Sequence, residues 1–230
     1  MSSSASRRLL LVGHGRMGRQ VEALSAGAGF EVAGIVNRES AARPDAWPDA
    51  DVAVDFSVAD AVPENTRALA ERGVPIVLGT TGWQANEPAL RAIVERHGIA
   101  IVAAPNFALG VNVFLALAER AGALMAQRVD FGAWIHELHH AAKRDAPSGT
   151  ALALKAALER AGYARGIDVS STRAGAIPGT HTIGFDAVSE TITLTHTARD
   201  RSVFARGALE AARWIQGRQG WFTMRDVIGV

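Results

Sequence analysis

The first half of the chain alternates short apolar runs with longer segments in which apolar residues recur at helical spacing. The run at 9–12 is entirely apolar and ends at a glycine, which is typical of a strand buried on both faces of a parallel sheet. Strands are predicted at 9–12, 30–36, 52–56, 75–78 and 99–103, and helices at 17–26, 61–72 and 88–97. The segment 38–51, rich in Pro, Ala and Asp, is predicted to be irregular. This β-α-β rhythm indicates a parallel sheet with right-handed crossovers and helices on both faces.

The second half has a different rhythm. Helices are predicted at 110–126, 149–161 and 203–216, and strands at 129–138, 167–173, 180–186 and 190–197. The last three strands follow one another without a helix between them, which favours an antiparallel or mixed sheet. We therefore expect an α/β chain with an N-terminal Rossmann-type parallel sheet at 1–106 and a smaller α+β domain with a mixed sheet at 107–202. The segment 203–230 is expected to return to the first domain.

Composition narrows the possible partners. The 230 residues include 24 Lys and Arg against 23 Asp and Glu, a net charge of +1. Nucleic-acid or membrane-surface binding requires a surplus of positive charge, so neither partner is expected. The uncharged stretch 98–118 is interrupted by Pro105, Asn106, Gly110 and Asn112, which argues against a membrane-spanning helix. The chain has no cysteine for disulfides or thiolate metal sites and no recognisable signal peptide, so we expect a cytoplasmic protein.

A glycine-rich turn follows the first predicted strand. Gly13, Gly15 and Gly18 form the pattern G-x-G-x-x-G between an apolar strand and a helix, which is the context in which this pattern binds dinucleotides. The first glycine permits the tight turn, the second lets a pyrophosphate approach the backbone, and the third allows close packing of helix on strand. The free N–H groups and the helix dipole then hold the negative charge. The pattern favours a dinucleotide site over a plain glycine turn.

The end of the second strand bears on which dinucleotide binds. An acidic residue is expected there to bond the adenosine ribose, but the sequence has Asn37 followed by Arg38. Arg38 can pair with the 2′-phosphate of NADPH, so the expected cofactor is NADPH, NADH or both. Two later strand ends, 79–82 and 104–107, carry small residues and hydroxyls that could line the nicotinamide site. Ordinary turn chemistry explains these two segments equally well.

Titratable residues crowd the end of the strand predicted at 129–138. His136, His139 and His140 lie close together and Lys143 follows them, which is unusual for a purely structural segment. The residues 148–150 then stand at the predicted start of a helix, where backbone N–H groups form an anion site. An anion site beside a fixed positive charge and a histidine suits a small substrate with carboxylates and a proton-transfer reaction.

The same segment also fits H-E-x-x-H, the pattern of zinc hydrolases, through His136, Glu137 and His140. That pattern needs a helix to bring both histidines to one metal, whereas the preceding residues are typical of a strand. Pro147 would end a helix soon afterwards, although Glu159 remains as a formal third ligand. We therefore expect no bound metal and keep zinc hydrolysis as the lesser alternative.

Taken together, these motifs resemble the dihydrodipicolinate reductase family, also called 4-hydroxy-tetrahydrodipicolinate reductase. The block at 137–151, which reads E-L-H-H-A-A-K-R-D-A-P-S-G-T-A, is the most specific part of the resemblance. The other matching segments follow the family order and lie at 13–18, 79–82, 106–107, 110–112, 173–175 and 224–227.

The resemblance implies an NAD(P)H-dependent reduction of 4-hydroxy-tetrahydrodipicolinate, a small dicarboxylate, to tetrahydrodipicolinate in lysine and diaminopimelate biosynthesis. His139 matches the family's general acid and Lys143 its catalytic lysine. Substrate-carboxylate contacts match His140, Gly149 and Thr150. Nucleotide contacts match Gly13, His14, Gly15, Arg16, Met17, Gly79, Thr80, Thr81, Ala104, Pro105, Asn106 and Phe107, to which the strand-end argument adds Asn37 and Arg38. The resemblance also implies that 1–106 binds the dinucleotide and that 107–202 binds substrate and assembles a homotetramer.

The chain departs from the family pattern at its nucleotide turn and at its ribose position. Many relatives carry one more residue in the glycine turn, and Asn37 is not acidic. The chain is also shortened between the second and third strands. These differences concern the choice between NADPH and NADH. A non-catalytic Rossmann protein that senses nucleotides is the alternative from another functional class, and it would have no need of His139 together with Lys143.

Overall fold

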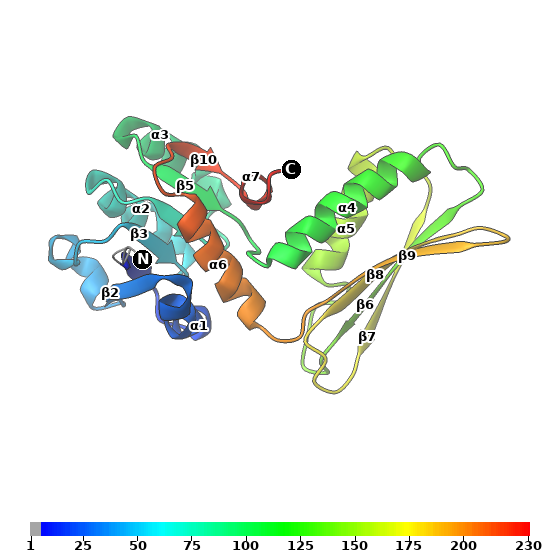
Figure 1. The fold of residues 1–230 in the computed structure, drawn as a ribbon, viewed down its shortest axis with the longest axis horizontal. Helices are drawn as coiled ribbons and strands as arrows, with labels where there is room; N and C mark the ends of the chain where they lie inside the picture. Colours follow the sequence, from blue (N-terminus) through cyan, green and yellow to red (C-terminus); the bar gives the residue numbers. More distant parts are fainter. Residues whose placement is uncertain (1–5) are drawn as a thin grey trace, which may run out of the picture. The chain divides into compact units, whose positions relative to one another are not determined.

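The computed structural model describes residues 6–230, which form two compact units (Figure 1). The first unit contains the chain up to Leu109 together with Ser202–Val230, and the second unit is Gly110–Arg201. Each unit has a sheet and a hydrophobic core of its own. Within the described residues, no helix combines the length and the apolar character that crossing a membrane would require.

The first unit is built on a six-stranded sheet with the strand order β10-β5-β4-β3-β1-β2, in which all pairs are parallel. The strands are β1 (Arg7–Val12), β2 (Phe30–Val36), β3 (Val52–Asp55), β4 (Ile76–Leu78), β5 (Ala100–Ala103) and β10 (Gly220–Phe222). Because β2 and β3 lie on opposite sides of β1, the winding direction reverses there. A ligand crevice is therefore expected beyond the carboxyl ends of β1 and β3. The predicted Rossmann-type parallel sheet is confirmed.

Helices cover both faces of this sheet (Figure 1). They are α1 (Arg16–Ser25), α2 (Val62–Glu71), α3 (Glu87–His97), α6 (Ser202–Trp214) and α7 (Met224–Ile228). Alternate side chains of β1 point to opposite faces. Leu9 and Leu11 pack into a core that includes residues of α1 and α6, whereas Leu10 and Val12 pack into a core with α2 and α3. This double burial explains why the strand is apolar at every one of these positions.

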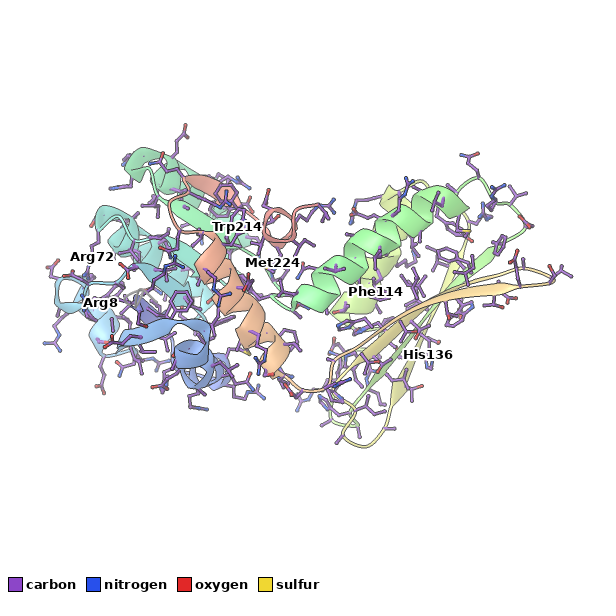
Figure 2. The ribbon with its side chains drawn as sticks, viewed as in Figure 1. Arg8, Arg72, Phe114, His136, Trp214 and Met224 are labelled. Carbon is purple, nitrogen blue, oxygen red and sulfur yellow. The ribbon has the colours of Figure 1, made fainter. Side chains whose placement is uncertain are left out.

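Two elements near the carboxyl terminus were not predicted from the sequence. The short strand β10 pairs with β5, and α7 begins at a capping box formed by Thr223 and Asp226. Met224 of α7 is buried in the core that also contacts Trp214 of α6, and both residues are labelled in Figure 2. Elements as short as these contain too few residues to show a hydrophobic period, so the pattern of apolar positions does not reveal them.

The second unit is built on a four-stranded mixed sheet with the order β7-β6-β8-β9. Its elements are α4 (Leu109–Met125), β6 (Gly132–His139), α5 (Gly149–Arg160), β7 (Ile167–Arg173), β8 (Thr180–Asp186) and β9 (Thr191–Thr197). Strand β6 runs parallel to β7 and antiparallel to β8, which is antiparallel to β9. Helices α4 and α5 lie on one face of the sheet (Figure 1), where Phe114 (Figure 2), Leu154 and Phe185 contribute to the core. The predicted α+β arrangement with a mixed sheet is confirmed.

A few local predictions differ from the structure. The strand expected from Val129 begins at Gly132, because Val129 is 82% exposed and lies outside the sheet. The segment 38–51 is not wholly irregular, since it contains two turns of 3-10 helix at Ser40–Ala42 and Pro44–Ala46. Two predicted site residues lie just inside elements that were expected to end or begin next to them, because β6 extends to His139 and α1 begins at Arg16.

Candidate active site

The glycine turn between β1 and α1 has the conformation that its sequence predicts. Gly13 has a φ of 91°, a left-handed value that favours glycine, and a Cβ there would lie 2.5 Å from the carbonyl oxygen of Phe56. A Cβ at Gly18 would lie 2.2 Å from the carbonyl oxygen of Gly13. Around Gly15, by contrast, no described atom outside Gly15 and its two chain neighbours lies within 4 Å of a Cβ position. The turn is therefore closed on its packing side and open at Gly15, as the approach of a phosphate requires.

A cavity of about 440 Å³ lies beside this turn. Five of the predicted nucleotide contacts line it, namely Gly13, His14, Gly15, Asn37 and Arg38. Residues that were not predicted also line it, namely Val12, Val36, Ala41, Phe56, Ser57, Val58, Ala61 and Asn65. Ser57 and Val58 follow the end of β3 and Asn65 comes from α2, so these residues line the cavity because β3 pairs with β1, a strand order that the local sequence pattern does not show.

The two residues at the end of β2 contribute different chemistry to the cavity wall. The Asn37 Oδ1 accepts hydrogen bonds from the backbone N–H groups of Glu39 at 2.9 Å and Ser40 at 3.0 Å. The Asn37 carbonyl therefore stabilises the local turn, and its amide N–H groups are the donors it can offer to a ribose. Arg38 is exposed beside the cavity and carries a permanent positive charge.

The other predicted nucleotide contacts do not line this cavity. Arg16 and Met17 begin α1, and Thr81 is exposed after β4. Thr80 is buried, and its Oγ1 donates to the buried carboxylate of Asp55 at 2.9 Å. Burial raises the pKa of Asp55 in spite of the hydrogen bonds that it accepts. Thr80 thus ties the loop after β4 to the end of β3.

The predicted contacts in the loop after β5 also lie outside the cavity beside the glycine turn. Ala104 and Pro105 line a separate cavity of about 320 Å³. The Asn106 Oδ1 accepts a hydrogen bond from the N–H of Ala108 at 2.9 Å, within the loop itself. Phe107 is buried in the core, where its ring meets that of Phe56 edge-on at 6.1 Å between centroids. Gly79, after β4, also packs against Phe56, since a Cβ there would lie 2.1 Å from the ring. The Gly79 and Phe107 positions therefore support the cavity wall from behind.

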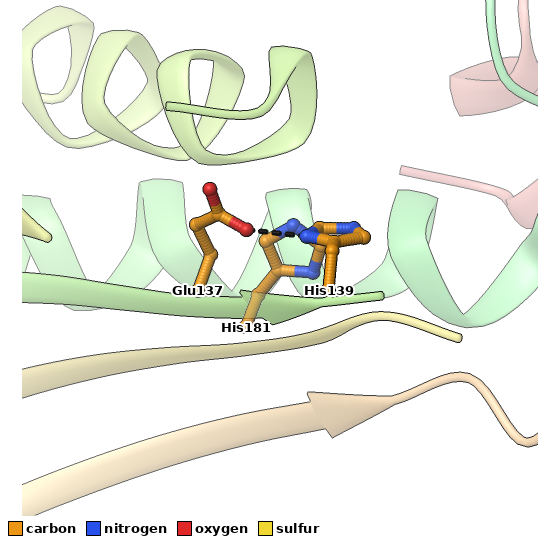
Figure 3. Close-up of side chains that lie close together, drawn as sticks. All are labelled: Glu137, His139 and His181. Carbon is orange, nitrogen blue, oxygen red and sulfur yellow. Dashed lines mark hydrogen bonds and ion pairs between the residues drawn. The ribbon is translucent and has the colours of Figure 1, made fainter. Parts of the chain in front are cut away.

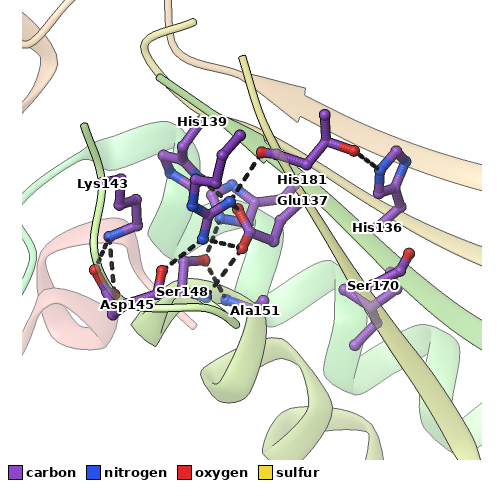
Figure 4. A network of polar contacts seen from close by, with 12 residues as sticks. His136, Glu137, His139, Lys143, Asp145, Ser148, Ala151, Ser170 and His181 are labelled. Carbon is purple, nitrogen blue, oxygen red and sulfur yellow. Dashed lines mark hydrogen bonds and ion pairs between the residues drawn. The ribbon is translucent and has the colours of Figure 1, made fainter. Parts of the chain in front are cut away.

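A buried polar network occupies the carboxyl end of β6 in the second unit (Figure 4). The carboxylate of Glu137 is fully buried, and the guanidinium of Arg173 donates to its two oxygens at 2.6 and 3.0 Å. The backbone N–H of Ser148 donates to Glu137 Oε1 at 3.2 Å, and His139 Nδ1 is hydrogen-bonded to Oε2. Glu137 and His139 can pair because residues two apart lie on the same face of a strand.

Burial and these contacts shift the pKa values of Glu137 and His139. Burial would raise the pKa of Glu137, but its hydrogen bonds, above all those from Arg173, lower the pKa to about 2. Burial lowers the pKa of His139 below its ordinary value, and the attraction to Glu137 offsets only part of this effect. The Glu137 carboxylate is therefore ionised at neutral pH, and it accepts the Nδ1–H of His139. The Nε2 atom is then the nitrogen through which His139 exchanges a proton.

A second histidine lies against His139. Figure 3 shows His181, from β8, beside His139, and the two ring centroids are 5.1 Å apart. The Nε2 atom of His181 lies 2.9 Å from Ser148 Oγ, which also accepts the N–H of Ala151 at 3.2 Å and so caps α5. Burial lowers the pKa of His181 to about 4, so this ring is neutral at physiological pH.

The remaining predicted substrate-site residues surround this network. The Nζ atom of Lys143 bonds both carboxylate oxygens of Asp145, at 2.7 and 2.8 Å, and this contact lowers the pKa of Asp145. His140 is half-buried directly after β6, and Gly149 and Thr150 open α5. The structure thus brings His139, His140, Lys143, Gly149 and Thr150 to the end of β6, the turn after it and the first turn of α5. Sequence reasoning gave Glu137 a role only in the zinc-hydrolase alternative and gave none to Arg173 or His181, although the E-x-H spacing on a strand was a usable signal.

The H-E-x-x-H alternative is not supported by this geometry. His136 lies on β6 and not on a helix, so its side chain points to the face of the sheet opposite to Glu137. The Nε2 atom of His136 lies 3.0 Å from the hydroxyl of Thr172 on the neighbouring strand. His136 and His140 are therefore not arranged as two ligands one helical turn apart.

A different trio brings possible metal ligands together. Glu137, His139 and His181 each offer an atom within 4.8 Å of the others. However, the Glu137 carboxylate already accepts hydrogen bonds from Arg173, His139 and a backbone N–H. A guanidinium in direct contact with the carboxylate also repels a cation. The donor set therefore fits a hydrogen-bonded network better than a cation site.

Comparison with known proteins matches almost the whole chain to one family. Residues 7–107 match the family model described as "Dihydrodipicolinate reductase, N-terminus", and residues 110–228 match "Dihydrodipicolinate reductase, C-terminus". The 4-hydroxy-tetrahydrodipicolinate reductase of Christiangramia forsetii is 34% identical over 231 residues, covering 96% of this chain and 97% of the relative. The enzyme of the same name from Acidiphilium cryptum is 40% identical over 241 residues, covering 94% of each chain.

A solved structure supports the fold independently. The dipicolinate-bound dihydrodipicolinate reductase from Paenisporosarcina sp. TG-14 superimposes with a TM-score of 0.77 and 21% identity. The match covers 94% of this chain and 97% of the solved chain, so both units have counterparts in it.

Proposed function

This chain belongs to the dihydrodipicolinate reductase family, and we propose that it reduces 4-hydroxy-tetrahydrodipicolinate to tetrahydrodipicolinate with NAD(P)H, in the biosynthesis of diaminopimelate and lysine. The observation that carries the proposal is that the two halves of the family match in order, over residues 7–107 and 110–228. The glycine turn lies within the first match and the buried polar network within the second.

The first unit has the features that a bound dinucleotide requires. The open space at Gly15 and the cavity of about 440 Å³ leave room for a pyrophosphate against the backbone. Gly15 is also the N-cap of α1 and has no side chain to satisfy the first N–H groups of that helix. When bound, the dinucleotide supplies the hydride. Arg38 attracts a 2′-phosphate and Asn37 does not repel it, so we propose that both cofactors are used, with a modest preference for NADPH.

A general acid is needed for the reaction to balance. Replacing the hydroxyl group of the substrate by hydrogen consumes a hydride and a proton and releases water. We assign the proton donor to His139, whose imidazolium form carries an exchangeable proton on Nε2 while its Nδ1–H is held by Glu137. The half-buried position of His139 limits competition from bulk water.

The substrate carries two carboxylates, which explains the cationic and N–H-rich surroundings of His139. The N–H groups at the start of α5, near Gly149 and Thr150, suit one carboxylate. We assign Lys143 to the negative charge that builds up during reduction, with Asp145 holding its ammonium group in place. His140 completes the set of substrate contacts.

The direct test mixes the protein, NADPH and freshly prepared substrate and follows the loss of nicotinamide absorbance. Oxidation above the enzyme-free rate is expected. NADPH binding without oxidation would instead support the nucleotide-sensor alternative. The His139→Gln variant in the same assay controls for a contaminating reductase, because only activity that belongs to this chain decreases with the substitution.

We also propose that the chain works as a homotetramer in the cytoplasm. Within the second unit, α4 and α5 lie on one face of the sheet and the other face carries polar side chains such as those of Thr182 and Thr195, which is consistent with sheet-to-sheet assembly. Light scattering after size-exclusion chromatography tests the mass, and a monomer at micromolar concentration contradicts this part of the proposal. Cell fractionation tests the location.

A further inference from the structure

The buried carboxylate of Glu137 is the most costly group in the second unit to keep charged. A buried carboxylate is tolerated only where hydrogen bonds and opposite charge replace its hydration. The guanidinium of Arg173 and the backbone N–H of Ser148 provide that replacement. The Glu137 side chain has no surface exposed to solvent. Glu137 was assigned a role only in the zinc-hydrolase alternative and none in the reductase reaction, yet its Oε2 contacts His139.

We propose that Glu137, held in place by Arg173, is the positioning residue that orients the His139 ring and confines its proton exchange to Nε2. The inference rests on the proposed function, because His139 acts as the general acid only if the chain is the reductase. Since Nδ1–H donates to the carboxylate, the neutral ring has its lone pair on Nε2 and the charged ring has its transferable proton there. Without the carboxylate, both tautomers and both ring flips become available to His139.

Charge explains why a carboxylate stands here and not an amide. Arg173 from β7 and Lys143 from the turn after β6 are cations near His139, and both disfavour its imidazolium form. Glu137 is the anion that opposes them and keeps the imidazolium accessible. A neutral side chain of the same shape would leave Arg173 without its carboxylate partner beside a general acid that must itself become cationic, while Lys143 keeps its pair with Asp145.

The strands on the other side of His139 add no charge. His181 from β8 lies against the ring, and His196 from β9 is paired in register with His181. Burial lowers the pKa of both residues, so both rings are neutral at physiological pH. The charges that act on His139 are thus the carboxylate of Glu137 and the cations of Arg173 and Lys143, and Lys143 is itself paired with Asp145.

A purely structural role is the competing explanation, because the Glu137–Arg173 pair also ties β6 to β7. The two explanations differ in what they predict for His139. A structural tie has no effect on the tautomer or the titration of a folded protein. A positioning role predicts a single tautomer and a pH profile that depends on the charge of Glu137.

The first experiment uses the wild-type protein and no activity measurement. Histidine ¹⁵N–¹H correlation spectra, assigned with the His139→Gln variant, report which ring nitrogen carries the proton. Above the pKa of His139 we expect only the Nδ1–H tautomer at this residue. An Nε2–H tautomer, or an average of the two, overturns the proposal whether or not the chain proves to be a reductase.

The second experiment compares Glu137→Gln with Glu159→Gln, the same chemical change at an exposed residue of α5 that pairs with Lys155. Loss of the negative charge lowers the pKa of His139, so the basic limb of the kcat profile moves to lower pH and kcat at neutral pH falls about tenfold per unit of that movement. The KM for NADPH stays unchanged, and the Glu159 variant behaves as wild type.

These outcomes separate the two hypotheses. An active wild-type enzyme whose Glu137→Gln variant folds and keeps the wild-type kcat profile contradicts the positioning role and leaves the proposed function intact. An inactive wild type contradicts the proposed function, and the tautomer spectrum then decides the positioning role alone. If Glu137→Gln does not fold, Arg173→Lys removes the fork but keeps the charge. A mixed tautomer at His139 in that variant supports the proposal, and an unchanged tautomer opposes the part assigned to Arg173.

Discussion

Replacing Gly15 by alanine separates the ligand contact of the glycine turn from its role in folding. Gly15 has a φ of −73° and a ψ of −161°, an extended conformation that alanine adopts. A Cβ there would meet no described atom within 4 Å outside Gly15 and its two chain neighbours. Alanine is a poorer N-cap than glycine by about 0.5 kcal/mol. The reduced freedom of the unfolded chain offsets this cost by about 0.4–1 kcal/mol. The free energy of unfolding should therefore change by less than about 0.5 kcal/mol.

The added methyl group fills the space through which a pyrophosphate reaches the backbone. We expect the NADPH dissociation constant of Gly15→Ala to rise at least about tenfold, equivalent to about 1.4 kcal/mol of binding free energy. The Tm should stay within about 2 °C of wild type, since about 1 kcal/mol corresponds to about 2–4 °C in a chain of this size. Fluorescence titration with NADPH and thermal unfolding in the absence of ligand measure the two quantities.

Gly13→Ala is the matched control. Gly13 has a φ of 91°, and its Cβ would lie 2.5 Å from the Phe56 carbonyl oxygen. The left-handed conformation alone costs about 1–2 kcal/mol for alanine, and the end of β3 must also shift. We expect a Tm lowered by about 2–8 °C or more. The reasoning is refuted if Gly15→Ala binds NADPH as wild type does, or if it lowers the Tm as much as Gly13→Ala.

Other substitutions test the remaining assignments. Arg38→Ala should weaken NADPH binding several-fold, about 1 kcal/mol, and leave NADH binding nearly unchanged, as measured by titration with each cofactor. The loss of NADPH affinity should be smaller at high salt, because salt screens the charge of Arg38. His139→Gln should lower kcat by about 10²–10⁴ with an unchanged NADPH dissociation constant, whereas Lys143→Ala should lower kcat and raise the KM for substrate in steady-state assays. The pKa of Glu137 is lowered from 4.5 to about 2, so its contribution to stability is complete above about pH 4.5 and is lost as the pH falls toward 2. Urea unfolding across that interval should show a smaller loss of stability in Glu137→Gln than in wild type.

Much of the first unit could be predicted because its signals are local. The apolar run at 9–12 and the three glycines that follow it fix a buried strand, a tight turn and a helix within a dozen residues. The far wall of the cavity could not be predicted in the same way. Ser57, at the end of β3, and Asn65, on α2, line this wall. They lie beside the glycine turn because β3 pairs with β1. Strand order is a tertiary property, so the sequence pattern indicated one side of the cavity and left the other open.

In the second unit too, the sequence alone does not determine the site, because the segment 136–140 fits either a helix or a strand. On a helix, His136 and His140 would share a face. On the strand that actually forms, Glu137 and His139 share a face and His136 points away. The partner that keeps Glu137 charged is Arg173, which lies 36 residues further along and meets it only because β6 and β7 pair in the register that sets His139 opposite Arg173. A slip of one residue would place the guanidinium on the other face of the sheet and leave the carboxylate buried without its cation. The acid chemistry proposed for His139 therefore depends on the pairing of β6 with β7, which no local pattern in this sequence encodes.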